Sequence, residues 1–155
     1  MVNHYNPNIF MDNSITTDPN KLNEIGHDII GAAFEVRKTV GKYFREKYYK
    51  YALAYELQQK GHDIAIECPL PALYKWMEIE NSYRMDLVVD QCVVVENKAL
   101  HQVGEEEYRQ LLSYLILSRF KLGYLINFGA DDFCIAKRDF KFNPYFGIYR
   151  FVNGL

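Results

Sequence analysis

Apolar residues recur at helical spacing in the first third of the chain. The first series is Leu22, Ile25, Ile29, Val36 and Val40. Because these positions are three, four or seven residues apart, they predict one amphipathic helix. Asp18 before Pro19 is typical of a helix start, and Gly41 is typical of a helix end.

Two further segments have a helical pattern. One runs from about Phe44 to Lys60 and the other from about Glu105 to Ser118. In the first of them, the predicted apolar stripe consists of Phe44, Tyr48, Ala52 and Tyr55, widened by Leu53 and Leu57. Gly61 follows this helix directly and ends it.

After Gly61 the pattern becomes extended. Residues 64–74 predict one or two strands interrupted by Pro69 and Pro71, and residues 83–89 and 93–98 predict a β-hairpin. The valine runs of this hairpin are apolar on both faces, which favours central strands covered on both sides. Further strands are predicted at Gly123 to Phe128, Phe133 to Lys137 and Phe146 to Val152.

This order of elements predicts one mixed α/β sandwich over residues 21–155, preceded by a polar N-terminal arm over residues 1–20. A chain of 155 residues, 49% hydrophobic, is large enough for one domain with a real core. No internal repeat or linker interrupts it. Twenty-three residues are Tyr or Phe, which suits either an aromatic core and rim or a surface that stacks bases; the first is favoured.

Charge and cysteine content narrow the functional classes. The net charge of -2 argues against tight autonomous nucleic-acid binding, which usually needs a basic excess. Cys68, Cys92 and Cys134 form no CxxC pair, so they predict buried apolar side chains in a reducing compartment. No apolar run is long enough to span a bilayer, and we expect a cytoplasmic protein without a membrane partner.

The hairpin carries the chemistry. Side chains alternate along a strand, so Glu96 and Lys98 share a face. If the turn contains the three residues 90–92, Asp86 lies across from Glu96 and joins that face. A two-residue turn would instead place Asp86 across from Val95 and break the site unless a bulge intervened.

Two carboxylates on an apolar sheet are costly unless a positive charge lies between them. Mg²⁺ or Mn²⁺ fits, because Mg²⁺ needs only one or two carboxylates and completes its shell with water and phosphate. Asp86 and Glu96 are therefore the predicted metal ligands, and Lys98 would hold the attacking water. The simpler interpretation is an ordinary ion pair on an exposed strand face.

The pattern resembles the PD-(D/E)XK nuclease superfamily, and within it the small GxxExxY proteins. The resemblance is carried by the segments IIGAAFEV, REKYYKYALAYEL, YRMDLVV, VVVENKAL, YRQLLSYL and GYLINF. It implies a restriction-endonuclease-like three-layer sandwich, with a central mixed sheet flanked by helices. It also implies a catalytic site of Asp86, Glu96 and Lys98, supported by Gln110 and Tyr114, with Glu46 as a further acidic residue.

Two positions depart from the GxxExxY pattern. Tyr43 stands in place of the glycine, and Asn97 stands between Glu96 and Lys98. We expect Tyr43 to change the entry into the second helix and thus the direction of Glu46.

The sequence predicts a metal-dependent phosphodiesterase that hydrolyses the backbone of DNA or RNA. The alternative is a non-catalytic binding or assembly module that keeps the nuclease fold. A third alternative is an enzyme acting on a small phosphorylated or nucleotide substrate, which would not need a basic groove. Arg84 is expected on the strand face opposite Asp86, pairing locally, and Trp76 in a turn. A homodimer is possible if the aromatic segment from Tyr145 to Phe151 pairs with a second chain.

Overall fold

The computed structural model describes residues 15–136 and 144–154 of the chain. The helices are α1 (Pro19–Val40), α2 (Glu46–Gln59) and α3 (Glu105–Ser118). Residues 1–14 of the predicted N-terminal arm lie outside the described part. Helix α1 begins as the sequence predicts, with the Asp18 carboxylate accepting from the Asn20 N–H and Pro19 in the first turn. None of the described helices combines the length and the apolarity that crossing a bilayer requires.

The strands form one mixed sheet. They are β1 (Ile64–Tyr74), β2 (Met77–Val89), β3 (Val93–Lys98), β4 (Leu122–Asn127), β5 (Asp132–Ile135) and β6 (Phe146–Val152). Their order across the sheet is β1-β2-β3-β4-β6-β5. Strands β3 and β4 run parallel, as do β5 and β6, and the other neighbours are antiparallel.

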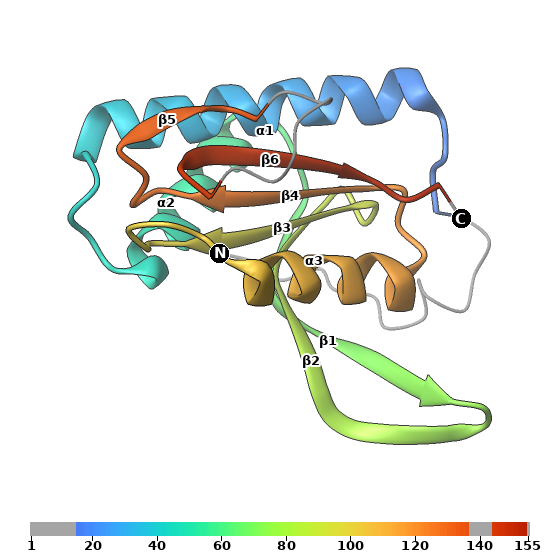
Figure 1. The fold of residues 1–155 in the computed structure, drawn as a ribbon. Helices are drawn as coiled ribbons and strands as arrows, with labels where there is room; N and C mark the ends of the chain where they lie inside the picture. The colour runs from blue at the N-terminus through green and yellow to red at the C-terminus, as the bar shows by residue number, and fades with distance from the viewer. Residues whose placement is uncertain (1–14, 137–143, 155) are drawn as a thin grey trace.

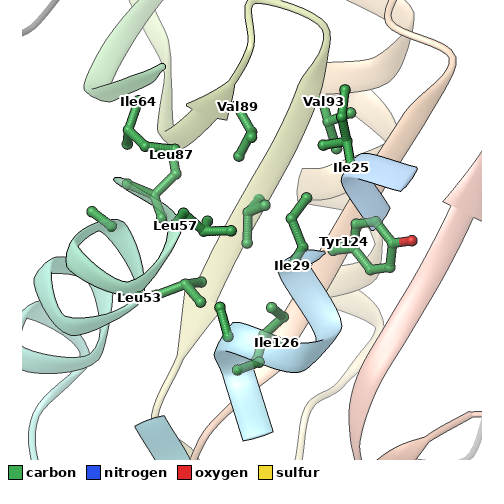
Figure 2. Close-up of a cluster of buried hydrophobic side chains, with 14 of the residues drawn as sticks. Ile25, Ile29, Leu53, Leu57, Ile64, Leu87, Val89, Val93, Tyr124 and Ile126 are labelled. Carbon is green, nitrogen blue, oxygen red and sulfur yellow. The ribbon is translucent and has the colours of Figure 1, made fainter. Parts of the chain in front are cut away.

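Helices cover both faces of this sheet, which gives three layers (Figure 1). Helices α1 and α2 pack on one face and α3 packs on the other. Figure 2 shows the first core, where side chains of both helices, among them Ile29 and Leu57, meet those of Leu87 and Ile126 from the strands. The fold is the predicted restriction-endonuclease-like α/β sandwich.

Several predicted elements differ in their limits. Strand β1 continues through Pro69 and Pro71, with an irregularity between Leu70 and Ala72, because it is an edge strand that does not need every backbone donor. Strand β2 begins at Met77 instead of Tyr83, and the β1–β2 hairpin projects from the body (Figure 1).

The position of β6 in the sheet and the buried side of α2 also differ from the predictions. Strand β6 lies between β4 and β5, so it is not an edge strand and gives no reason to expect dimerisation through it. On α2, the buried residues are Tyr49, Lys50, Leu53, Ala54 and Leu57. Leu53 and Leu57 are thus buried as predicted, but Phe44, Tyr48 and Tyr55 are exposed, so the aromatic part of the predicted stripe was wrong.

The turn between β2 and β3 fixes the register on which the predicted site depends. Val89 pairs with Val93 and Leu87 with Val95, so the turn contains the three residues 90–92. The three-residue turn is therefore confirmed. Asp90 and Gln91 both adopt positive φ, at 49° and 57°, which is unfavourable for residues with a side chain.

A histidine held between two carboxylates supports this turn. The His62 ring lies between two carboxylates, with Nδ1 2.6 Å from Asp90 Oδ2 and Nε2 2.7 Å from Asp28 Oδ2. The second Asp90 oxygen accepts from the Asp63 N–H, and the Asp90 N–H donates to the Asp63 carbonyl. Burial lowers the pKa of His62, but the hydrogen bonds that its ring makes to both carboxylates outweigh this effect and leave the pKa raised.

Replacing His62 by Gln is expected to reduce the free energy of unfolding by about 1–2 kcal/mol at pH 6, the size of a charge-assisted hydrogen bond. Because the folded-state pKa lies above the usual 6.5, this contribution is complete below pH 6.5 and is lost as the pH rises through the folded-state value. Urea unfolding of both proteins at pH 6 and pH 9 should show the difference shrinking at pH 9. His27→Gln, at an exposed position on α1, is the matched control. If His62→Gln lowers the free energy of unfolding equally at both pH values, the contribution of a protonated His62 ring between Asp28 and Asp90 is contradicted.

Candidate active site

The site lies where β2 and β3 separate. Their ladder of paired residues ends at Leu87 and Val95, and beyond it the β1–β2 hairpin turns away from β3 (Figure 1). At the next position, Asp86 Oδ2 accepts a hydrogen bond of 2.9 Å from the backbone N–H of Asn97. A carboxylate thus replaces a backbone partner at the fork, and Asp86 is held beside the strand that carries Glu96 and Lys98.

Helix α2 brings a third carboxylate to the fork. Glu46 is the first residue of the helix, and its position depends on the loop before it. Tyr49 fixes that loop, because its hydroxyl donates to the Gly41 carbonyl at 2.7 Å and accepts from the Phe44 N–H at 3.2 Å. The buried Tyr49 ring also stacks on Phe128, with centroids 4.6 Å apart.

Glu46, Asp86 and Glu96 converge. Each offers one carboxylate oxygen, and these oxygens all lie within 4.8 Å of one another. Two ammonium groups border the cluster: Lys98 Nζ lies 3.4 Å from Glu96 Oε1, and Lys50 Nζ lies 3.9 Å from Asp86 Oδ1. Lys50 also binds Glu67, at 3.0 Å, so its charge is shared with a carboxylate outside the cluster.

The cluster has three carboxylates for two ammonium groups, one of which, Lys50, is shared with Glu67. Burial, with repulsion from Asp86, raises the pKa of Glu96 to about 8 although Lys98 opposes the shift. Burial also raises the pKa of Asp86 and of Glu46. Glu96 Oε2 is buried without a hydrogen-bond partner among the described residues. An unpaired buried carboxylate oxygen is rare and costly, and a cation placed among the three carboxylates would satisfy it.

A cleft of about 630 Å³ opens beside Lys98 on the α3 side. Gln110 and Tyr114 line it from one face of α3, as their spacing predicts. They also satisfy each other: Gln110 Nε2 donates to the Tyr114 hydroxyl at 2.9 Å, and that hydroxyl donates to the Arg84 carbonyl at 2.7 Å. The pair is therefore a fixed part of the wall.

Arg84 lines the same cleft, contrary to the local pairing expected on the opposite face. It stands two residues from Asp86, and strand alternation places such residues on one side. The cleft wall also contains Arg109 and the carboxylate of Glu106. Of its three cations, Lys98 is paired with Glu96 and Arg109 with Glu105, at 3.4 and 2.8 Å, so Arg84 is the cation of the wall that these pairs do not neutralise.

Comparison with known families adds to this geometry. The family model of the PD-(D/E)XK nuclease superfamily matches residues 23–138, which include every residue of the site. The chain belongs to the PD-(D/E)XK nuclease superfamily. No curated protein and no solved structure matches it.

Two site residues of this superfamily member were missed by the sequence analysis. Lys50 stands one helical turn after Glu46, a spacing that could have indicated it. Asn127 ends β4, and its side-chain amide binds both the N–H and the carbonyl of Leu100, at 2.9 and 3.0 Å. Gly129 allows this approach, since a Cβ there would lie 2.4 Å from the Leu100 carbonyl oxygen. These contacts anchor the chain just after Lys98, together with the Phe128 N–H, which donates to the Lys98 carbonyl at 2.9 Å.

Glu96→Gln is expected to stabilise the metal-free protein. The change keeps the shape of the side chain and removes one charge from the crowded cluster. Since the folded-state pKa of Glu96 is raised, the carboxylate destabilises the fold progressively as the pH rises above the unfolded value, so the effect is largest at alkaline pH. At pH 8.5 with a chelator, we expect a gain of roughly 1 kcal/mol, or about 2–4 °C in melting temperature.

The matched control is Glu24→Gln, an exposed position on α1 that should leave the melting temperature unchanged. A metal-free Glu96→Gln protein that melts below the wild type would contradict the charge imbalance inferred from the three carboxylates.

Proposed function

We propose that this chain is a Mg²⁺- or Mn²⁺-dependent phosphodiesterase that hydrolyses the backbone of a nucleic acid. The observation that carries the proposal is the convergence of Glu46, Asp86 and Glu96 beside Lys98 at the fork between two central strands. Membership of the nuclease superfamily supports the same activity. The anchoring of Glu46 through Tyr49 further supports placing the chain among the GxxExxY proteins.

The donor set fits a hard divalent cation. All three residues offer carboxylate oxygens, as Mg²⁺ and Mn²⁺ prefer, and one oxygen of Glu96, Oε2, is buried without a hydrogen-bond partner among the described residues. Asp86 and Glu96 would hold the ion, with Glu46 as a third ligand or as the acceptor of a bound water. The ion would lower the pKa of a bound water and stabilise charge on the phosphoryl oxygens.

The remaining residues have complementary roles. Lys98 is held against Glu96 at the edge of the cleft, where its ammonium can orient the attacking water or stabilise negative charge as it develops. Arg84 would bind a backbone phosphate through its guanidinium. Gln110 and Tyr114 would keep the cleft wall rigid, and the free donor of the Gln110 amide can contact the substrate backbone.

Lys98→Ala is expected to reduce cleavage by about 100-fold or more, because it removes a charge that acts in the transition state. The same variant should still be stabilised by Mg²⁺ or Mn²⁺, since Lys98 is not a ligand. Cleavage of labelled single- and double-stranded DNA and RNA measures the first effect. Thermal melting with and without each metal measures the second.

Lys38→Ala, an exposed lysine on α1, is the control for the loss of a charge. Cleavage by Lys98→Ala at the wild-type rate would refute the assigned role. If the wild type shows neither cleavage nor a metal-dependent rise in melting temperature, the non-catalytic binding or assembly module becomes the better account, consistent with the net charge of -2.

A further inference from the structure

The outward face of α2 and the residues before it carry a cluster of exposed aromatic side chains. Tyr43, Phe44, Tyr48 and Tyr51, which we call the aromatic patch, surround an open hollow of about 750 Å³. Their exposed fractions range from 39% for Tyr51 to 88% for Tyr43. Single exposed aromatics are ordinary, but a contiguous group of four marks an interaction surface.

The aromatic patch borders the core and does not fill it: Phe44 and Tyr48 meet the buried Tyr49 ring edge-to-face, with centroids 6.4 and 6.0 Å away, and remain exposed themselves. The core-facing side of α2 consists of other residues, among them Tyr49, Leu53 and Leu57, which are fully buried. Phe44 and Tyr48 stack on each other, with centroids 4.2 Å apart and an interplanar angle of 17°. The pair thus forms a stacked aromatic step on the surface, and Tyr43 stands almost wholly in solvent beside it.

The charges around the hollow are positive. Arg45 and Lys47 are its charged lining residues, and no acidic side chain of the described residues lines it. Lys42 also lies over the Tyr43 ring, 5.6 Å from its centroid, but its ammonium is paired with the Asp131 carboxylate, so Arg45 and Lys47 supply the positive charge of the rim. Aromatic faces interleaved with cations are complementary to unstacked bases joined by phosphates. An apolar protein segment would have no use for the positive rim.

Lys50 joins the aromatic patch to the candidate active site. Its ammonium lies 6.0 Å from the centroid of the Tyr51 ring and 3.9 Å from Asp86 Oδ1. Glu46, which belongs to the carboxylate cluster, is flanked in the chain by Arg45 and Lys47 of the hollow. A strand bound on the patch would therefore reach the carboxylates around the first turn of α2.

We propose that the aromatic patch binds unpaired bases, so that the substrate of the site is a single-stranded nucleic acid or a frayed end. This inference rests on the proposed nuclease function for its biological meaning, but not for its test. Tyr43 and Tyr51 would stack on bases, while Arg45 and Lys47 contact the neighbouring phosphates. A duplex would be a poor ligand, because its own stacking covers the faces of its bases.

Binding can be measured without cleavage, in EDTA, by fluorescence anisotropy with a labelled dT12 strand. The double variant Tyr43→Ala/Tyr51→Ala is expected to bind about 10-fold or more weakly than the wild type, the effect of losing base stacking. A strand of twelve abasic residues should bind the wild type and the double tyrosine variant equally weakly. Arg45→Gln/Lys47→Gln should reduce the slope of log affinity against log salt by about 1.4, the value for two lost phosphate contacts on a single strand.

Tyr55→Ala is the matched control, since Tyr55 is exposed on the same helix but does not line the hollow. It should bind dT12 as the wild type does. Circular dichroism and melting of each variant establish that the helix remains folded. Equal dT12 binding by the wild type and the double tyrosine variant would overturn the proposal, as would preference for a 12-bp duplex. Conversion of a wild-type dimer to a monomer by the tyrosine changes would also overturn it, and would assign the patch to an interface between copies of this chain.

The binding test and the cleavage test fail separately. If dT12 binding depends on the aromatic patch but no metal supports cleavage, the patch stands and the nuclease proposal fails. If cleavage occurs but the double tyrosine variant keeps the wild-type KM for a single strand, the nuclease proposal stands and the patch fails. When both proposals hold, the double variant raises KM and leaves kcat nearly unchanged, because stacking distant from the reacting phosphate is removed.

Discussion

The register of the β2–β3 hairpin is the constraint on which the site depends. A three-residue turn pairs Val89 with Val93, and the same register brings Asp86 to the strand that carries Glu96. A slip of one residue would move one strand's side chains to the opposite face and separate the carboxylates. The turn includes two non-glycine residues with positive φ, so it needs outside support. That support comes from His62, which ties Asp90 of the turn to Asp28 of α1.

The carboxylates of the candidate site destabilise the metal-free fold, because burial raises the pKa of each of them. Three carboxylates share a small buried volume with the ammonium groups of Lys50 and Lys98, and Lys50 divides its charge between Asp86 and Glu67. Such a cluster is tolerated because the surrounding sheet is rigid: β3 is covered on both faces and fully paired to β4. The end of β3 is then fixed from β4 through Asn127. Because the carboxylates are held close together before any cation binds, a bound cation would attract all of them without a rearrangement of the site.

The sequence predicted what depends on local geometry and missed what depends on packing between elements. Strand alternation and the length of the turn were enough to relate Asp86 to Glu96, and the i, i+4 spacing to relate Gln110 to Tyr114. On α2, Leu53 and Leu57 were placed correctly in the core, but the aromatic part of the predicted stripe was wrong, because aromatic residues at helical spacing give the same pattern whether a sheet or solvent faces them. Lys50 is buried only because partners from β1 and β2 meet it, and no pattern within α2 contains that information. The alternation of side chains along a strand, which related Asp86 to Glu96, could also have placed Arg84 on the same face as Asp86.

The two faces of α2 explain why its outward side is aromatic. Each residue on the inward side has a structural or site role. Tyr49 stacks on Phe128 and fixes the helix start, Leu53 packs in the core, and Glu46 belongs to the carboxylate cluster. The outward rings contribute less to this packing: Phe44 and Tyr48 meet the Tyr49 ring edge-to-face, but the patch keeps apolar area exposed beside Arg45 and Lys47. Because one rigid helix carries both sets, a strand held on the outward rings would be held at a fixed distance from Glu46. Glu46 of the carboxylate cluster and Tyr48 and Tyr51 of the aromatic patch thus belong to one helix. Tyr49 orients both sets, because it fixes the loop before the helix and meets Phe44 and Tyr48 edge-to-face.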